Sequence, residues 1–340
     1  MTGASLRVLH LVGSGRSAFF ADLSQVYARE VFAPPGTEAS YACVEPGGAW
    51  RLGGSLDALG PARPCAEALA ALPEVDVVVP HMFDAPGMVA FRALFEDVLG
   101  IPVVGPTPAT NALSMAKGWT ASVLREAGVC VPEGRTMPQG AAPPDMALPL
   151  VVKPDRGDNS VGLALVRDPA NLARALQDAW NADPGEPPAA RVESFIPGRE
   201  LRLCVVETVD GPIVPAVMEY PLEPDAPIRT VTEKLQLKGG RVEGQSTRAR
   251  PTLPAALSPA QRRACEVAAL AAHRALGARD YSLFDLRLEA GTDRPVFLEA
   301  GLFWAFARNS MVSRMLEASG RSAEADALWL WRRAALRRGC

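Results

Sequence analysis

PLVVKPDRGDNSVG, residues 149–162, is the stretch of sequence that decides the fold. Its first half is short, apolar and β-branched, which predicts a buried strand ending at Lys153. Its second half, from Asp155 to Gly162, is rich in glycine, aspartate, asparagine and serine, which predicts a turn-rich loop. Successive backbone N–H groups in such a loop can bind a phosphate. The stretch therefore predicts a strand that carries a lysine into a phosphate-binding loop.

Strands and helices alternate before this stretch. Short apolar runs bounded by turn residues predict buried strands, and longer stretches between them predict helices. Strands that alternate with helices form a parallel sheet. We therefore expect a Rossmann-like α/β domain over residues 1–108. The expected elements are strands 6–12, 75–80 and 101–105 and helices 19–30 and 87–99.

The remaining sequence predicts two further domains, a small central unit over 109–191 and a C-terminal unit over 192–340. Both mix helices and strands as α+β structure, so the whole chain is expected to be α/β and α+β in three domains. The polar segment 221–256 is too long for a passive connector and is expected to be a functional loop. The expected elements are helices 109–128, 168–181, 258–277 and 310–338 and strands 150–153, 163–166, 200–207, 211–219, 282–289 and 295–300.

Composition excludes several classes of protein. Of the 340 residues, 48% are hydrophobic and 21% charged, which provides a core and excludes wholesale disorder. A net charge of −3 argues against a general nucleic-acid binder. The six cysteines form no CxxC pair, so buried thiols in a cytoplasmic protein are expected. The first apolar run is broken by Arg7 and His10, which predicts a strand rather than a signal peptide, and no membrane partner is expected.

Lysine is scarce in this chain. Of 35 basic residues, only Lys117, Lys153, Lys234 and Lys238 are lysines, and all the others are arginines. A compact ammonium and a planar guanidinium are not interchangeable at a phosphate site. The few lysines therefore indicate where point charges are needed.

Separated segments carry groups suited to a nucleotide. Lys117 and Lys153 can neutralise a triphosphate, and Asn159 and Ser160 lie in the loop that can donate to its terminal phosphate. Free backbone groups beside Glu193, Ser194, Phe195 and Ile196 can bind a purine edge, and Glu200 can hold ribose hydroxyls.

Two carboxylates are suited to a metal ion. Asp285 and Glu299 lie on consecutive predicted strands and offer the hard oxygen ligands that Mg²⁺ prefers. An ion at that place could bridge phosphates during phosphoryl transfer.

Together these segments resemble ATP-grasp enzymes, and within that superfamily the chain is similar to D-alanine–D-alanine ligases. The resemblance implies a three-domain ATP-grasp architecture with ATP between the central and C-terminal domains. It also implies two Mg²⁺ ions (or Mn²⁺ in their place), an acyl-phosphate intermediate and a homodimer. The substrates implied are a small amino-acid-like acid and an amine.

The resemblance, together with candidates to replace the family residues that are missing here, assigns roles residue by residue. They are nucleotide binding for Lys117, Lys153, Asn159, Ser160, Glu193, Ser194, Phe195, Ile196 and Glu200; metal binding for Asp285, Glu299 and Asn309; catalysis for Lys234, Arg287 and Ser160; and substrate binding for His81, Arg308 and Ser310.

Departures concentrate on the acceptor side. The family's metal-binding Asn is Gly301 here, and its arginine two residues before the metal Asp is Leu283. Arg287 lies on the same strand face as Asp285 and is a candidate to take over that arginine's role, as is Arg308. The family's N-terminal Glu for the substrate amine is not evident. We therefore predict a specialised ATP-dependent carboxylate–amine ligase, for natural-product or dipeptide synthesis rather than the cell wall.

Several alternatives stay open at this stage. The chain could be a D-alanine–D-alanine ligase proper, an ATP-binding protein that has lost ligase chemistry, or a phosphotransferase that stops at the phosphoryl step. Lys238 rivals Lys234 for the loop position, and His81 could be a structural histidine. Trp304 and Phe306 either narrow the acceptor pocket or simply pack.

Overall fold

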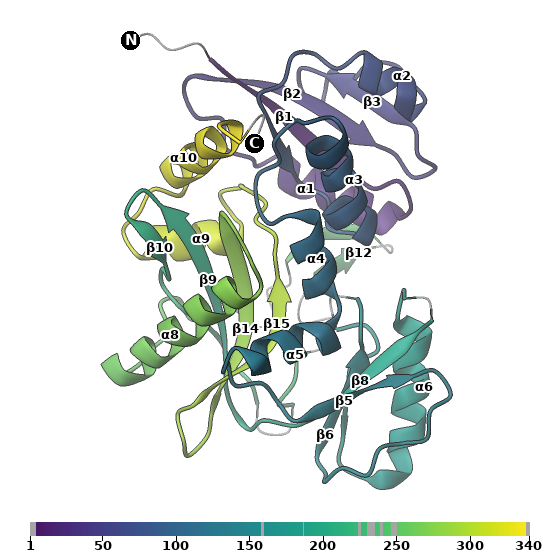
Figure 1. Cartoon of the computed structure of the whole chain (residues 1–340), viewed down its shortest axis with the longest axis vertical. Coiled ribbons are helices and arrows are strands. Elements are labelled where there is room, and N and C mark those ends of the chain that lie inside the picture. Colours follow the sequence, from purple (N-terminus) through teal and green to yellow (C-terminus); the bar gives the residue numbers. More distant parts are fainter. Residues whose placement is uncertain are drawn as a thin grey trace.

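A computed structural model of the chain describes residues 5–157, 160–185, 187–223, 226–229, 235–238, 241–245 and 250–337. Three sheet-containing domains follow one another along the long axis of the molecule (Figure 1). The mixture of α/β and α+β structure expected from the sequence is confirmed. Within the described residues, no helix is both long enough and apolar enough to cross a membrane.

The N-terminal domain is built on a four-stranded sheet in the order β3-β2-β1-β4. β1 pairs in parallel with β2 and β4, as the Rossmann-like expectation requires, whereas β3 is antiparallel to β2. The expected strand at 101–105 is reduced to one bridge between Val78 and Val103. The elements are β1 Leu6–Gly13, α1 Ala18–Ala28, β2 Thr37–Val44, β3 Trp50–Gly53, α2 Cys65–Ala70, β4 Val77–Pro80, the π-helical turns η1 Pro86–Ala90 and η2 Leu94–Val98, and α3 Phe91–Ala93 between them.

Two helices replace the single helix expected over 109–128. α4 spans Pro108–Met115 and α5 spans Lys117–Glu126. The chain breaks at Ala116, whose φ of −95° and ψ of 103° are extended rather than helical. Lys117 therefore begins a new helix, and the N–H groups of Lys117 and Gly118 both donate to Asp155, at 2.9 Å and 2.8 Å.

Gly118 is required by this close approach. A Cβ atom at that position would lie 2.1 Å from Thr136 Oγ1 and 3.0 Å from Asp155 Oδ1. The absence of a side chain lets the start of α5 press against the central sheet. This contact sets the position of Lys117.

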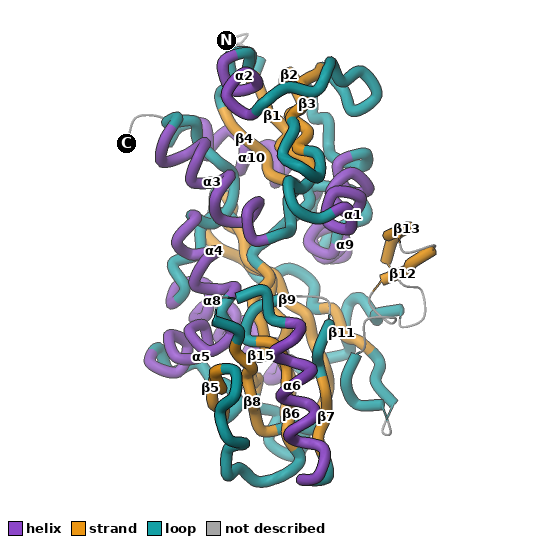
Figure 2. Tube along the Cα trace, turned by 90° about the vertical axis from the view of Figure 1, so that its right-hand side faces the viewer, coloured by secondary structure: helices purple, strands orange, loops and turns teal. Residues whose placement is uncertain are grey.

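The central domain is an antiparallel four-stranded sheet in the order β5-β8-β6-β7. The helix α6 covers one face of this sheet, as Figure 2 shows. Its buried residues recur at helical spacing and pack on Leu150, Val152 and Val192. The elements are β5 Gly134–Pro138, β6 Leu150–Pro154, β7 Ala164–Val166, η3 Pro169–Asn171, α6 Leu172–Ala182 and β8 Ala189–Ser194.

The C-terminal domain is an antiparallel sheet in the order β10-β9-β14-β15, with β11 also paired to β9. Helix α8 packs on one face, and α9 and α10 pack on the other together with residues of β1 and β4. The helix expected over 310–338 is thus two helices with Gly320 between them. The elements are β9 Gly198–Thr208, β10 Gly211–Ile213, β11 Met218–Tyr220, β12 Leu235–Lys238, β13 Arg241–Gln245, α8 Pro259–Ala275, β14 Tyr281–Glu289, β15 Pro295–Gly301, α9 Met311–Ala318 and α10 Ala323–Ala335.

A buried carboxylate joins the N-terminal and C-terminal domains. Asp280 is fully buried and accepts a hydrogen bond of 2.7 Å from the N–H of Gly105. Arg333 and Arg337 of the C-terminal segment also bond to Asp280, at 2.7 to 2.9 Å. Since a buried carboxylate needs such partners, this contact fixes how the two domains meet.

Candidate active site

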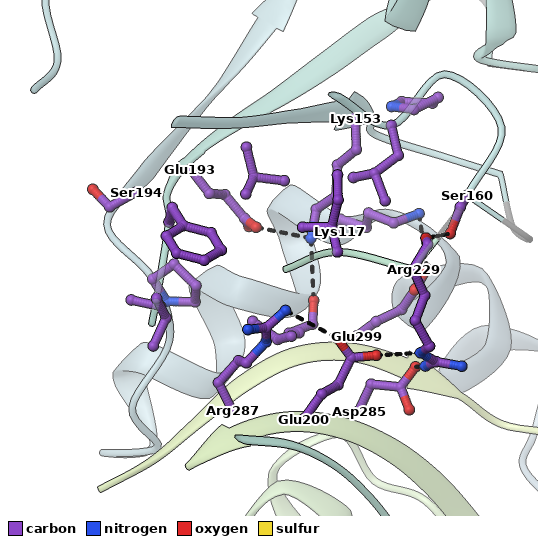
Figure 3. A pocket seen from close by; sticks show the side chains of 18 of the residues that line it. Lys117, Lys153, Ser160, Glu193, Ser194, Glu200, Arg229, Asp285, Arg287 and Glu299 are labelled. Atoms are coloured by element: carbon purple, nitrogen blue, oxygen red, sulfur yellow. Dashed lines mark hydrogen bonds and ion pairs between the residues drawn. The ribbon is translucent and has the colours of Figure 1, made fainter. Parts of the chain in front are cut away.

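A cavity open to solvent lies between the central and C-terminal sheets, and the empty space there, counted together with adjoining solvent, is about 830 Å³. Figure 3 shows the side chains of both sheets directed into it. The sequence-predicted residues that line it are Lys117, Lys153, Ser160, Glu193, Ser194, Phe195, Ile196, Glu200, Asp285, Arg287 and Glu299.

The two lysines reach the cavity from different elements. Lys153, at the end of β6, pairs with Glu193 at 2.8 Å and donates to the carbonyl of Leu298 at 3.3 Å. Lys117, at the start of α5, pairs with Glu299 at 3.0 Å and donates to the carbonyl of Gly157 at 2.7 Å. Both ammonium groups are about nine-tenths buried. The cavity therefore holds two concentrated positive charges next to the loop 155–162, which is called the lid loop below.

Glu193 is a buried carboxylate held between two cations. Burial opposes its ionisation, but Lys153 and Arg191 outweigh that effect and lower the pKa of Glu193. Arg191 lies two residues earlier on β8, so its side chain is on the same strand face and bonds Glu193 at 3.0 Å. Glu193 is thus a fixed anion on the cavity wall.

Glu200 is held by two arginines. Its carboxylate accepts from Arg229 Nε at 2.5 Å and from Arg287 Nη2 at 3.0 Å. Burial lowers the pKa of Arg287, which Glu200 counteracts. Arg287 also donates to the carbonyls of Gly198 and Pro227. Arg287 is therefore a rigid part of the wall.

Asp285 and Glu299 suit a divalent cation. They are direct partners in the β14–β15 register, and both line the cavity. Carboxylate oxygens are hard donors, and Mg²⁺ commonly takes one or two carboxylates together with phosphates and water. The donor set therefore fits a divalent ion. Among the residues that the structure describes, no group of three or more His, Cys, Asp or Glu side chains is placed to hold a metal.

The loop after β6 lies over the cavity. Ser160 has a φ of 62°, and its hydroxyl donates to the carbonyl of Arg229 at 2.8 Å. This bond joins the central domain to the segment that follows β11, so the loop is closed onto the C-terminal domain. Asn159 lies outside the described residues.

Part of the predicted purine-binding segment is already bonded. The N–H of Ser194 donates to the carbonyl of Glu133 at 2.8 Å, and that of Phe195 donates to Pro149 at 3.0 Å. These two amides are therefore not free, contrary to the expectation from sequence. The sequence did not indicate these bonds because their acceptors, Glu133 and Pro149, lie just before β5 and β6, far from Ser194 and Phe195 along the chain.

The predicted acceptor-side residues do not line this cavity. His81 is fully buried, and its Nε2 lies 3.0 Å from His10 Nδ1. Arg308 is exposed and pairs with Glu324 at 3.5 Å. Ser310 caps α9 and shares a 2.9 Å hydrogen bond with Ser313.

Two further predicted residues are not among those described on the cavity wall. Asn309 lies in an exposed turn before α9 and is not on the cavity wall. Lys234 lies outside the described residues. It precedes the β12–β13 hairpin, whose second strand lies beside α1 of the N-terminal domain.

Aromatic side chains fill the loop that leads from β15 to α9. Trp304 and Phe306 are buried and stacked, with ring centroids 4.5 Å apart, and Tyr281 packs on both edge to face. Phe306 has a φ of 51°, which is unusual for a bulky residue and is held by this packing. Of the two options left open above, packing is the one observed for both residues.

Two arginines that bond the carboxylates of the cavity wall were not predicted. Arg202 binds both oxygens of Asp285 at 2.6 Å, and Arg229 bonds Glu200 and lies over the ring of Tyr220, 3.5 Å from its centroid. A signal for Arg202 existed, because Arg202 and Glu200 are two residues apart on one strand and share a face. Arg229 lies in an irregular segment and had no such signal.

Comparison with known proteins places this geometry in a family. Residues 139–325 match the family model described as D-ala D-ala ligase C-terminus. The D-alanine–D-alanine ligase of Frankia casuarinae is 32% identical over 277 residues, which cover 78% of this chain and 66% of that protein. The D-alanine–D-alanine ligase of Synechococcus sp. (strain JA-2-3B'a(2-13)) is 29% identical over 248 residues, covering 65% of this chain and 69% of that protein.

Solved structures share the fold over nearly the whole chain. VanG D-Ala:D-Ser ligase from Enterococcus faecalis superposes with a TM-score of 0.77 at 21% identity and covers 96% of this chain and 98% of its own. The D-alanine–D-alanine ligase of Coxiella burnetii gives 0.79 at 18% identity, covering 99% and 95%. At such identities these likenesses establish the architecture.

Proposed function

Since the chain belongs to the D-alanine–D-alanine ligase family, we propose that it joins the carboxyl group of one amino-acid-like substrate to the amine of another, at least one of the two being other than D-alanine. It is an ATP-grasp carbon–nitrogen ligase of a family that uses ATP and Mg²⁺. Its substrates, its place in specialised synthesis and its dimerisation are parts of this proposal.

The observation that carries the proposal is a contrast within the site. Lys117, Lys153 and Glu299 converge on one cavity, as an ATP-binding site requires. His81 and Ser310, which the resemblance assigns to the substrate, are instead bonded to His10 and Ser313. Two lysines and a carboxylate on one cavity, together with His81 and Ser310 bonded inside the protein, support a ligase for other substrates.

The cavity residues have definite tasks in this proposal. Lys117 and Lys153 neutralise phosphate charge, and Ser160 keeps the lid loop closed so that water is excluded. Glu193 and Glu200 are held as fixed anions by their arginine and lysine partners and accept hydrogen bonds from the nucleotide. Asp285 and Glu299 would hold magnesium, which supplies charge neutralisation at the phosphates.

The proposed reaction has two steps, both implied by the family resemblance. An oxygen of the acid's carboxylate attacks the γ-phosphorus, and the bond to the leaving ADP oxygen breaks. The amine nitrogen then attacks the acyl carbon, inorganic phosphate leaves, and the nitrogen loses a proton. Arg287, bonded to Glu200, offers a fixed positive charge beside Asp285 on the same strand.

The test is ADP release from the purified enzyme with a panel of D- and L-amino acids, singly and in pairs, with product masses from mass spectrometry. We expect brisk ADP release and an amide product with a pair other than two D-alanines. Rapid formation of D-alanyl-D-alanine from D-alanine alone would favour the second candidate, a D-alanine–D-alanine ligase proper, which the named relatives favour. A phosphorylated product formed without an amine would indicate a phosphotransferase.

A further inference from the structure

The carboxylate of Asp285 is bound by the guanidinium of an arginine on the neighbouring strand. Arg202 Nε and Nη2 donate to its two oxygens, both at 2.6 Å, in a parallel bidentate pair. Arg229 Nη2 lies 3.7 Å from the second oxygen. Bidentate charge-assisted pairs of this kind are among the strongest polar contacts in proteins. The carboxylate is therefore neutralised by the protein itself.

The position of Arg202 is set by the sheet. Arg202 and Asp285 are direct partners in the antiparallel β9–β14 register, so their side chains leave the sheet on the same face. Tyr220 lies next to both arginines, with its ring centroid 5.5 Å from the guanidinium carbon of Arg202 and 3.5 Å from that of Arg229. The side chain of Arg202 is only 18% exposed, and that of Asp285 only 12%. Moving Arg202 away would remove the nearest described cationic partner of Asp285 in a largely buried site, which is costly.

The neighbouring carboxylate, Glu299, is paired with a lysine, a different kind of cation. Glu299 pairs with Lys117, a single ammonium on a flexible stem rather than a planar fork. Two residues further on, Gly301 offers no side-chain oxygen, and a Cβ there would lie 3.4 Å from the ring of Phe303. The oxygens that could face a cation therefore come from Asp285 and Glu299, which are opposite one another.

We propose that Arg202 acts as a fixed cation bound to Asp285, a carboxylate of the cavity wall, so that the enzyme–nucleotide complex binds one divalent ion, between Asp285 and Glu299, rather than two. Arg202 is a positioning residue, because it acts through Asp285. Its guanidinium supplies the positive charge that a second ion would otherwise bring to this carboxylate. This inference rests on the proposed ATP site but not on which acid or amine is joined.

The first experiment counts ions. Full-length enzyme saturated with a non-hydrolysable imido analogue of ATP is dialysed against Mn²⁺, and bound Mn²⁺ is measured by electron paramagnetic resonance. We expect one bound ion per complex, and two would overturn the proposal. This count needs no amino acid, so failure of the proposed ligase reaction, seen as no ADP release with any pair, is a separate result.

The second experiment tests Arg202 itself. Removing a positive charge next to a divalent ion should tighten binding, so Arg202→Met is expected to bind Mn²⁺ at least about tenfold more tightly in the analogue complex. A purely structural arginine would give weaker or unchanged binding, and either result would overturn the role assigned to Arg202.

The matched control is Arg199→Met. Arg199 lies on the same strand and makes the same kind of bidentate pair, with Glu219 at 2.7 and 2.6 Å, but Glu219 does not line the cavity, whereas Asp285 does. The Arg199→Met enzyme should bind Mn²⁺ with unchanged affinity in the analogue complex. Arg202→Gln, which keeps a donor to Asp285 but loses the charge, is the second variant if the Met variant fails to fold, and it too should bind Mn²⁺ more tightly.

Discussion

The two ends of the proposed active site are built differently. At the nucleotide end, charged side chains from two sheets face one another across a cavity, and each carboxylate has a cationic partner. At the acceptor end, the loop after β15 is packed with buried aromatic rings, and His81 and Ser310 are bonded inside the protein. The first end is electrostatic and open to solvent, whereas the second is apolar and filled.

Under the proposed function, this difference indicates which parts of the enzyme a change of substrate affects. A triphosphate imposes the same charges whatever acid is activated, so ammonium and carboxylate groups are needed in fixed places. The acceptor end has to match the shape of its own substrate, and its residues can be exchanged as long as the loop still packs. Mutations at the two ends should therefore have different consequences.

The largest effect is expected at Lys153. Because Lys153→Ala removes a point charge from the phosphate site and leaves Glu193 with one cationic partner fewer, we expect kcat/KM to fall at least about 10³-fold, on the order of 4 kcal/mol. Lys153→Arg should also be poor, since a guanidinium does not replace a compact ammonium there. Steady-state ADP release measures both.

Arg174→Ala is the control for this loss. Arg174 is in the same domain, its side chain is 87% exposed, and it pairs with Asp178 only at 3.8 Å. Its removal should leave the kinetics unchanged. An active Lys153→Arg enzyme would contradict the argument from ammonium charge and weaken the distinction between the two ends.

The nucleotide end was easier to predict from sequence because its groups lie in short, regular segments. Lys153 ends a recognisable strand, and the spacing of Asp285 and Glu299 follows from two consecutive strands. Arg202 was missed because its partner is 83 residues away, and only the β9–β14 register brings the two together. Pairing between distant strands depends on the tertiary fold, which local patterns do not encode.

Prediction of the fold was limited in the same way, because local patterns do not encode tertiary contacts. Strands β1 and β4 of the N-terminal domain were predicted from their apolar runs, but β2, with a half-exposed pattern, and the edge strand β3 were not. The break at Ala116 was also missed, because an alanine favours a helix and only the contact of α5 with Asp155 overrides that preference. Tertiary contacts therefore decided what propensity could not.

A second prediction concerns the pH dependence of stability at the acceptor end. Burial lowers the pKa of His81 to about 4, and burial together with the neighbouring His81 lowers that of His10. The unfolded chain takes up a proton on His81 near pH 6.5, before the folded state does, so stability is lost as the pH falls through that value. From His81 alone we expect a loss of about 2 kcal/mol between pH 7.5 and pH 5 and about 3 kcal/mol by pH 4.

Urea unfolding at pH 7.5 and pH 5 measures this loss. His81→Gln should reduce the difference between the two pH values by about 2 kcal/mol, whatever its effect at pH 7.5. Tyr41 and Trp331, the aromatic groups packed around His10, bring no positive charge to the pair. An unchanged pH dependence in His81→Gln would mean that His81 is accessible to solvent, as a substrate-binding histidine would be.

A third prediction separates capping from substrate binding at Ser310. Its hydroxyl caps α9 through the N–H of Ser313, and the Ser313 hydroxyl accepts from Trp304 Nε1 at 3.0 Å. Ser310→Ala should therefore lower the free energy of unfolding by about 1 kcal/mol, as loss of an N-cap does. The KM for the amine should stay within about twofold, because a capping serine is not in contact with substrate. A tenfold rise in that KM with normal stability would show that Ser310 contacts the substrate instead.

The smallest effect is expected at Arg308, and it tests how far the filled loop extends. The side chain is 68% exposed, its ion pair with Glu324 spans 3.5 Å, and its guanidinium lies 5.6 Å from the ring of Phe32. Exposed pairs of this length contribute little, so Arg308→Ala should change the free energy of unfolding by less than about 0.5 kcal/mol and leave both KM values unaltered. Kinetics with saturating ATP and varied acid or amine decide the point. If the KM for either substrate rose tenfold, Arg308 would swing toward the reacting groups during turnover, and the acceptor end would share the charged character of the nucleotide end.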